Sequence, residues 1–267
     1  MRVCQQRPLL QSKPDFGVTL RTRRGVQQAL RCRSAVTDIA LVDKLLTARS
    51  QAEELFSAVE SKGLLTPGRS EKEVDKQVFQ LAAADYGTRQ HWHKRTPRFG
   101  ENTVHPIFVD TPDAQLKEDD ICFLDLGPVF KRIEADFGRT YVLGQDPEKH
   151  KLNQALTRIF NICKQQYLSA PDIIGADFFT FVKETCAQHG YQYANDQFCA
   201  HLLGEFSHEV KFGETSTNYA CPDNCTPMNA PHTNGQPRHW ILEIHLLQDP
   251  KIGRYGGFYE DLLDISI

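Results

Sequence analysis

The sequence predicts an α+β domain built around a largely antiparallel sheet. Two observations lead to this fold class: paired amphipathic helical segments occur in each half of the chain, and apolar, strand-like segments follow each pair. With 267 residues the chain can bury the core of one large domain or two small ones. No apolar run reaches the ~18 residues of a membrane helix, so we expect no membrane partner.

Four helices are expected. The first covers residues 37–63, where apolar residues recur at helical spacing. The second begins at Ser70, which together with Glu73 forms a capping-box pattern. The third and fourth cover residues 146–170 and 175–190. A helix pair therefore precedes paired strands in each half of the chain.

The remaining segments are expected to be strands and loops. A hairpin begins at Ile121 and extends to residue 143, and later apolar segments cover residues 198–213, 239–249 and 256–267. Residues 218–237, rich in Pro, Asn and Cys, are expected to form a loop.

Charge is unevenly distributed along the chain. Residues 1–37 contain eight Lys/Arg and one acid, a balance of +7, although the whole chain carries −3. We expect a basic, poorly ordered leader over residues 1–37 and one domain over residues 38–267. Organelle transit peptides share the Arg-rich, acid-poor composition, so mitochondrial targeting is the alternative to a cytoplasmic location. The acidic remainder argues against nucleic acid as a partner.

Eight cysteines are scattered along a chain that has no secretory signal, which favours reduced thiols. Only Cys221 and Cys225 form a close pair. A structural zinc would need two more ligands, for which His232 and His239 are the nearest candidates. A disulfide or two free loop thiols are the favoured alternatives.

Acidic residues occupy apolar strands. Asp125 and Asp136 stand eleven residues apart in the expected hairpin, and burying an ionised carboxylate is costly unless it is paired or bound to metal. An ion pair between Asp136 and Arg139 would account for one of them. Glu243 and Glu260 repeat the pattern in the later strands. Four such acids are too many for a core without a neutralising cation.

The ligand types indicate the kind of cation. Carboxylates with one imidazole, contributed by His201, suit Mn²⁺, Fe²⁺, Co²⁺ or Zn²⁺. Four carboxylates match the charge of two divalent ions. Two ions about 3.5–4 Å apart can hold a bridging hydroxide and bind both oxygens of a reacting carbonyl group.

The order of these residues resembles peptidase family M24, which includes methionine aminopeptidases, Xaa-Pro aminopeptidases, prolidases and creatinase. The resemblance covers about residues 38–267 and includes D-x(10)-D followed by RT, and H-x(6)-HE. It implies the pita-bread fold, with a curved antiparallel sheet covered by helix pairs. It also implies that Asp125 chelates one ion, that Asp136 and Glu260 bridge the two ions, and that His201 and Glu243 complete the coordination of the second ion.

The same resemblance implies further catalytic residues. His208, seven residues after His201, would stabilise the reacting carbonyl. A second substrate-side histidine would be His105, which lies twenty residues before Asp125, with His93 as the rival. Glu243 would assist proton transfer in addition to binding metal.

Two features depart from the family pattern. Ala200 and Leu202 flank His201 where the aminopeptidases commonly have glycines, which narrows the space beside the ions. Only about 37 residues precede the first expected helix, so we expect the catalytic half alone, with methionine aminopeptidase closest in size.

The leading hypothesis is a dinuclear metal hydrolase that cleaves an N-terminal peptide bond or a related small amide by a metal-bridging hydroxide. The alternatives are a pseudoenzyme that binds peptides or proteins, and a creatinase-like hydrolase of non-peptide substrates. A small peptide or amide is the expected partner, and a homodimer is an assembly that would fit.

Overall fold

The structure is a computed structural model, which describes residues 23–170, 172–213, 215–263 and 265. The first 22 residues of the expected leader lie outside the described residues. Helix α1 begins at Arg23, not at the expected Thr37, so the backbone of the later part of the leader segment is helical. The division at residue 37 stays a prediction.

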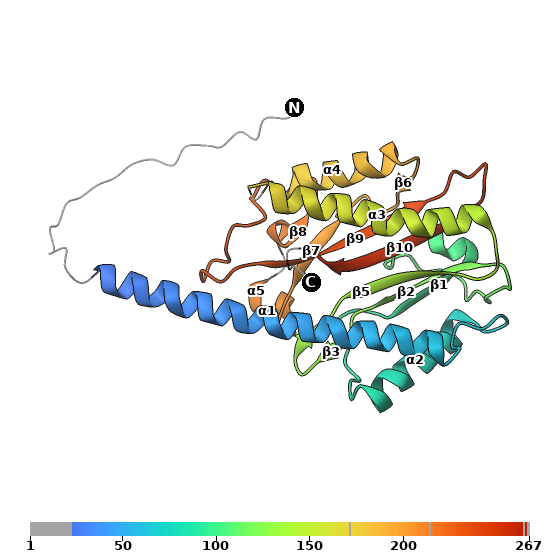
Figure 1. The fold of residues 1–267 in the computed structure, drawn as a ribbon, viewed down its shortest axis with the longest axis horizontal. Coiled ribbons are helices and arrows are strands. Elements are labelled where there is room, and N and C mark those ends of the chain that lie inside the picture. Colours follow the sequence, from blue (N-terminus) through green and yellow to red (C-terminus); the bar gives the residue numbers. More distant parts are fainter. Residues whose placement is uncertain (1–22, 171, 214, 264, 266–267) are drawn as a thin grey trace.

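The elements follow the α+β pattern (Figure 1). The helices are α1 (Arg23–Ser61), α2 (Glu71–Asp85), η1 (Gly100–Val104), α3 (Pro147–Ser169), α4 (Gly175–Gln188), α5 (His208–Phe212) and η2 (Ser216–Asn218). The strands are β1 (Thr96–Phe99), β2 (Ile121–Leu126), β3 (Val129–Phe130), β4 (Ile133–Glu134), β5 (Phe137–Val142), β6 (Gln192–Tyr193), β7 (Ala200–Leu203), β8 (Tyr219–Ala220), β9 (His239–Leu247) and β10 (Gly256–Leu262).

One antiparallel sheet forms the centre of the molecule. Its strand order is β1-β2-β5-β10-β9-β7-β8, with β6 paired to β9. The expected hairpin is confirmed as the β2–β5 pair, and the small β3–β4 hairpin lies between its two strands in the sequence. Strands from the two halves of the chain meet where β5 pairs with β10.

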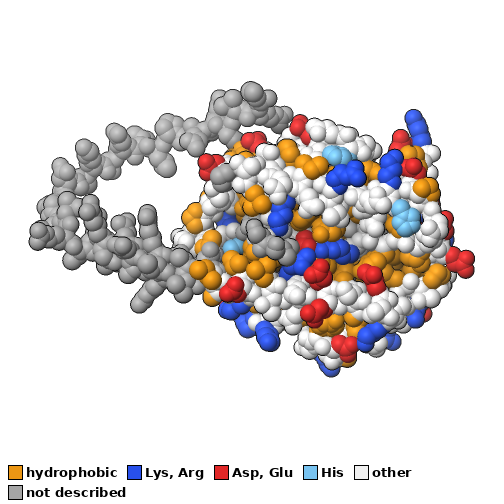
Figure 2. Space-filling model, viewed as in Figure 1, with side chains coloured by type: hydrophobic (Ala, Val, Ile, Leu, Met, Phe, Trp, Pro, Cys, Tyr) orange, Lys and Arg blue, Asp and Glu red, His pale blue; other side chains and the backbone are white. Residues whose placement is uncertain are grey.

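The helix pairs cover one face of this sheet. Tyr259 of β10 packs on Phe160 of α3, with ring centroids 4.9 Å apart, and Asp261 of the same strand binds Arg49 of α1. Successive strand residues point to opposite faces, so Glu260, between them, points to the face away from these helices. Figure 2 views the helix-covered face, where basic, acidic and apolar side chains are interspersed.

Local sequence signals account for most helix boundaries. Ser70 and Glu73 form the expected capping box at the start of α2, and Asp146 caps α3. The segment expected to be strand and loop over residues 198–213 also contains the short helix α5, which Ser207 caps through a bond from Val210 N–H. Among the described residues, no helix has both the length and the apolar character needed to cross a membrane.

Candidate functional site

Three carboxylates lie in one row across the sheet. Asp125 of β2 is paired with Gly138 of β5, which is paired in turn with Glu260 of β10. Glu260 is directly opposite Glu243 of β9. Facing residues in a sheet have Cβ atoms about 4.5–5.5 Å apart, and like charges at that distance destabilise the pair. The pairing of the strands therefore creates a site that needs positive charge.

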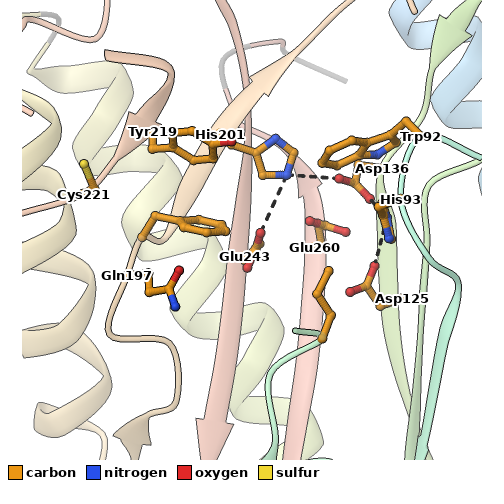
Figure 3. Close-up of a pocket in the computed structure, with 12 residues that line it drawn as sticks. Trp92, His93, Asp125, Asp136, Gln197, His201, Tyr219, Cys221, Glu243 and Glu260 are labelled. Atoms are coloured by element: carbon orange, nitrogen blue, oxygen red, sulfur yellow. Dashed lines mark hydrogen bonds and ion pairs between the residues drawn. The ribbon is translucent and has the colours of Figure 1, made fainter. Parts of the chain in front are cut away.

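The fourth carboxylate, Asp136, lies just before β5 and faces His201 of β7. The Nε2 atom of His201 is 3.1 Å from Oδ2 of Asp136 and 3.7 Å from Oε1 of Glu243. Its Nδ1–H donates to the carbonyl oxygen of Leu202 at 2.8 Å, which leaves the Nε2 lone pair directed at the acids. The structure thus brings together all five residues expected to bind metal (Figure 3).

These residues line a cavity of about 440 Å³. Trp92, Phe198 and Tyr219 add aromatic walls, and the Trp92 and His201 ring centroids are 4.9 Å apart. Within the described part of the chain, no lysine or arginine lines the cavity. The cavity is therefore acidic on its floor and apolar at its sides.

The protein alone does not neutralise all of these acids. Burial, reinforced by the neighbouring carboxylates, raises the pKa of Glu243 and of Glu260 well above the usual range. Burial also raises the pKa of Asp125 to about 7, although His93 opposes the shift. The Oε2 atom of Glu260 is buried without a hydrogen-bond partner among the described residues. Such groups fit divalent cations, which would supply the missing charge.

Two clusters of potential ligand atoms share Asp136. One consists of His93, Asp125 and Asp136, the other of Asp136, His201 and Glu260, and within each cluster the ligand atoms lie no more than 4.8 Å apart. The pKa of Asp136 is lowered because His93 and His201 outweigh the effect of burial. A shared carboxylate between two ligand clusters fits a pair of ions.

The structure places His93, and not the favoured His105, at this site. Nε2 of His93 is 3.1 Å from Oδ1 of Asp136 and 3.5 Å from Oδ1 of Asp125. Burial alone would lower the pKa of His93, but these two charges raise it to about 10. His105 follows η1, where its backbone N–H donates to Asn102, and it is not among the residues that line the cavity.

The placement of His93 has a simple geometric origin, and a role for His105 stays a prediction. Distance along the sequence from Asp125 favoured His105, but from that segment Ile107 lines the cavity instead. The segment before β1 returns to the sheet because the backbone N–H of Trp92 donates to Gly127 at 2.9 Å. A tertiary contact of this kind leaves no periodic signal in the sequence.

His208 lies behind His201, with the two rings stacked and their centroids 6.3 Å apart. Its Nδ1 is 2.7 Å from Oε2 of Glu134, and its backbone N–H donates to the other oxygen of Glu134 at 3.0 Å. Gly204 N–H donates to the same carboxylate at 3.1 Å. His208 is not among the residues that line the cavity, and its expected catalytic role stays a prediction.

Glu134 was not anticipated from the sequence. The available signal was a third acid inside the expected hairpin, at an apolar segment between Ile133 and Ala135. Glu134 is only 1% exposed, and β4 carries it next to the segment after β7, where its backbone N–H donates to Gly204 at 3.0 Å. This contact joins residues seventy positions apart in the chain.

Two local alternatives from the sequence do not hold. Arg139 does not neutralise Asp136. Instead, its guanidinium donates to Oδ2 of Asp261 at 2.6 Å and to the carbonyl oxygen of Glu260 at 2.6 Å. Cys221 carries a free thiol, which excludes a disulfide with Cys225. Among the described residues, neither cluster of potential metal ligands includes a cysteine.

A family model, metallopeptidase family M24, matches residues 43–233, which is more than half of the chain. The chain belongs to metallopeptidase family M24. A search of curated proteins finds no match.

Solved structures of M24 type show the same fold. The X-Pro aminopeptidase from Thermotoga maritima MSB8 is 16% identical with a TM-score of 0.63, over 86% of this chain and 62% of that one. The dipeptidase PepE from Mycobacterium ulcerans is 21% identical with a TM-score of 0.61, over 84% and 54%. A prolidase from Thermococcus sibiricus is 18% identical with a TM-score of 0.62, over 82% and 56%.

These matches establish the pita-bread fold, with the central antiparallel sheet expected for M24 proteins. The chain spans less than two thirds of the length of each of these structures. Ala200 and Leu202, which flank His201 where aminopeptidases commonly have glycines, are both buried in β7.

Proposed function

We propose that this M24 chain hydrolyses an N-terminal peptide bond, or a related small amide, with the help of two divalent cations. One observation carries the proposal. Four buried or nearly buried carboxylates meet at one cavity, and among the described residues no lysine or arginine lines that cavity to neutralise them. A folded protein keeps such a cluster when it binds cations.

The donor set defines which residues hold the ions. Asp125, Asp136 and Glu260 would hold one ion, and Asp136, Glu260, His201 and Glu243 the other. Ions held there would supply Lewis-acid activation of water and of the scissile carbonyl. The mixture of carboxylate and imidazole donors favours an ion of the group Mn²⁺, Fe²⁺, Co²⁺ and Zn²⁺.

The residues of the chain supply positioning and proton transfer. Nδ1–H of His208 is committed to Glu134, so the nitrogen left to hydrogen-bond a substrate carbonyl is Nε2. Glu243, the most exposed of the four carboxylates, would accept a proton from the attacking water and pass it to the leaving amine. Trp92, Phe198 and Tyr219 exclude water from the sides of the cavity and contact apolar parts of the substrate.

Similar structures suggest which substrates to try. Those structures are of an X-Pro aminopeptidase, a prolidase and a dipeptidase. The cavity of about 440 Å³ suits a short peptide segment better than a folded chain. We therefore propose short peptides with Xaa-Pro or Met-Xaa N-termini as the first substrates.

A peptide screen with controlled metal content tests the function. Metal-free protein should cleave none of the peptides, and addition of Mn²⁺ or Co²⁺ should restore cleavage that releases one N-terminal residue. Cleavage by rigorously metal-free protein would contradict the mechanism. Binding of peptides without cleavage, in the presence of bound metal, would favour the pseudoenzyme instead.

A further inference from the structure

His93 is not part of the M24 metal-ligand pattern, yet it lies against Asp125 and Asp136, two of the expected ligands. We infer that His93 is itself a metal ligand on the Asp125 side of the centre, so that each ion binds one histidine. The inference rests on the proposed two-ion function, and it adds a sixth ligand to the five expected from the sequence.

The shared carboxylate carries the first argument. Oδ1 of Asp136 lies 3.1 Å from Nε2 of His93, and Oδ2 of Asp136 lies 3.1 Å from Nε2 of His201. Two ligands each about 2.0–2.2 Å from one ion, at a right angle, lie about 3 Å from one another. Each histidine and its own oxygen of Asp136 therefore have the spacing of two donors to one ion, and the two pairs use different oxygens.

The hydrogen bonds of the two rings carry the second argument. Nδ1 of His93 lies 2.8 Å from the carbonyl oxygen of Lys94, and Nδ1 of His201 lies 2.8 Å from that of Leu202. A carbonyl oxygen only accepts, so in both rings Nδ1 carries the hydrogen. Metal-binding histidines usually donate their second nitrogen in this way. The resemblance extends to the acids, since Nε2 of each ring faces two carboxylates.

The loop that carries His93 is fixed in place. The His93 side chain is only 10% exposed, and its ring meets that of Trp92 edge-on, with centroids 4.7 Å apart. Both rings lie against Gly127, where an added Cβ would come within 2.4 Å of each of them. Because glycine alone admits this approach, the turn after β2 is shaped to bring His93 beside Asp125.

A protonated His93 that forms ion pairs with Asp125 and Asp136 is the competing arrangement. The two arrangements predict opposite effects on metal affinity. An imidazolium competes with the ion for the carboxylates, so its removal leaves affinity unchanged or raises it. A ligand contributes a bond to the ion, so its removal lowers metal affinity. The loss should exceed about 10-fold, because removal of a residue that only hydrogen-bonds a ligand already costs 10–100-fold.

Metal titration of metal-free full-length protein separates them. Wild-type protein and the His93→Ala variant are titrated with Co²⁺ by calorimetry, and the visible spectrum of the bound Co²⁺ is recorded. His150→Ala serves as the matched control, because His150 lies on α3 and its Nε2 is 3.1 Å from the carbonyl oxygen of Gly144, outside the cavity. His93→Gln, which keeps a polar group near the position of Nε2, replaces the alanine variant if that variant does not fold.

His93→Ala should bind one of two Co²⁺ ions more than about 10-fold more weakly than wild-type protein, and its Co²⁺ spectrum should change. Neither effect is expected for His150→Ala. Two ions bound to His93→Ala with wild-type affinity and spectrum would overturn the inference and leave the proposed function intact. Absence of Co²⁺ binding by wild-type protein would overturn the proposed function as well.

Discussion

Glu260 and Asp261 are neighbours on β10, equally buried, and yet their surroundings are opposite. Asp261 accepts hydrogen bonds from Arg49 at 2.9 Å and from Arg139 at 2.6 Å. Together these arginines lower its pKa despite burial. Glu260 points to the other face of the sheet, where burial and the neighbouring acids raise its pKa well above the usual range.

The same contrast separates the other buried acids. Glu134 has its charge satisfied by three N–H donors, from Gly204 and His208. Glu243 and Glu260, by contrast, face one another across the sheet, and the neighbouring carboxylates reinforce the effect of burial on the pKa of each. Asp261 and Glu134 thus have their partners within the protein, whereas Glu260 keeps a buried carboxylate oxygen without a hydrogen-bond partner among the described residues.

Removal of the shared carboxylate should have the largest effect. Asp136→Ala should lose bound metal and reduce turnover by more than about 100-fold, since even groups that only support a ligand cost 10–100-fold. Metal analysis of the purified variant and peptide hydrolysis measure the two effects. Asp110→Ala is the control, because its side chain is fully exposed. Wild-type metal content in Asp136→Ala would show that Asp136 binds no ion.

Paired substitutions at the two neighbours on β10 test the comparison itself. Asp261→Ala should lower the free energy of unfolding by about 2–3 kcal/mol, somewhat less than for fully buried pairs because both arginines are partly exposed. Urea unfolding without metal measures this value. Glu260→Gln should instead stabilise the metal-free protein, because it removes an acid that burial opposes. Destabilisation by both would show that the two acids are not of different kinds.

Glu134→Gln should separate positioning from metal binding. The glutamine keeps its size but not its charge, so His208 is held less firmly, and turnover should fall by about 10–100-fold. Metal content should stay at the wild-type value, as should turnover in Glu205→Gln, a half-exposed acid on the adjoining segment. A variant with unchanged kcat would remove the Glu134–His208 contact from the mechanism.

The pH dependence of stability gives the smallest expected effect. Asp125 has a pKa of about 7 in the metal-free fold against an ordinary 3.8, so it binds its proton more tightly when folded, and stability falls as pH rises between these values. His93, raised from 6.5 to about 10, contributes stability below pH 6.5 that is lost as pH rises through 10. Urea unfolding in chelator should therefore give lower stability at pH 8 than at pH 5.

Bound metal should remove this fall in stability between pH 5 and pH 8. Ions bind the deprotonated forms of the ligands, so the folded protein no longer gains stability from binding protons at these groups. The same unfolding series with saturating Mn²⁺ is the comparison. A metal-free protein whose stability rises from pH 5 to pH 8 would show that the acids of the site are neutralised within the protein, as Asp261 is.

Local signals predicted much of the fold. Helices α2, α3 and α4 and the hairpin β2–β5 were all predictable, because periodic apolar residues and caps act over a few residues. The start of α1 and the short helix α5 were not, since neither has a strong boundary signal. The five residues that meet at the cavity were predictable because a charge inside an apolar strand stands out wherever the strand lies.

The sequence by itself determined the kind of site: acids embedded in apolar strands need partners that offset their charge, and their order along the chain identifies the family. The tertiary structure alone decided which partners those residues have. It brought His93 rather than His105 to the acids, gave Arg139 to Asp261, and joined Glu134 to His208. Burial of a charge depends on the residue and its immediate neighbours, whereas its partners depend on strand pairing and loop packing between segments far apart in the chain.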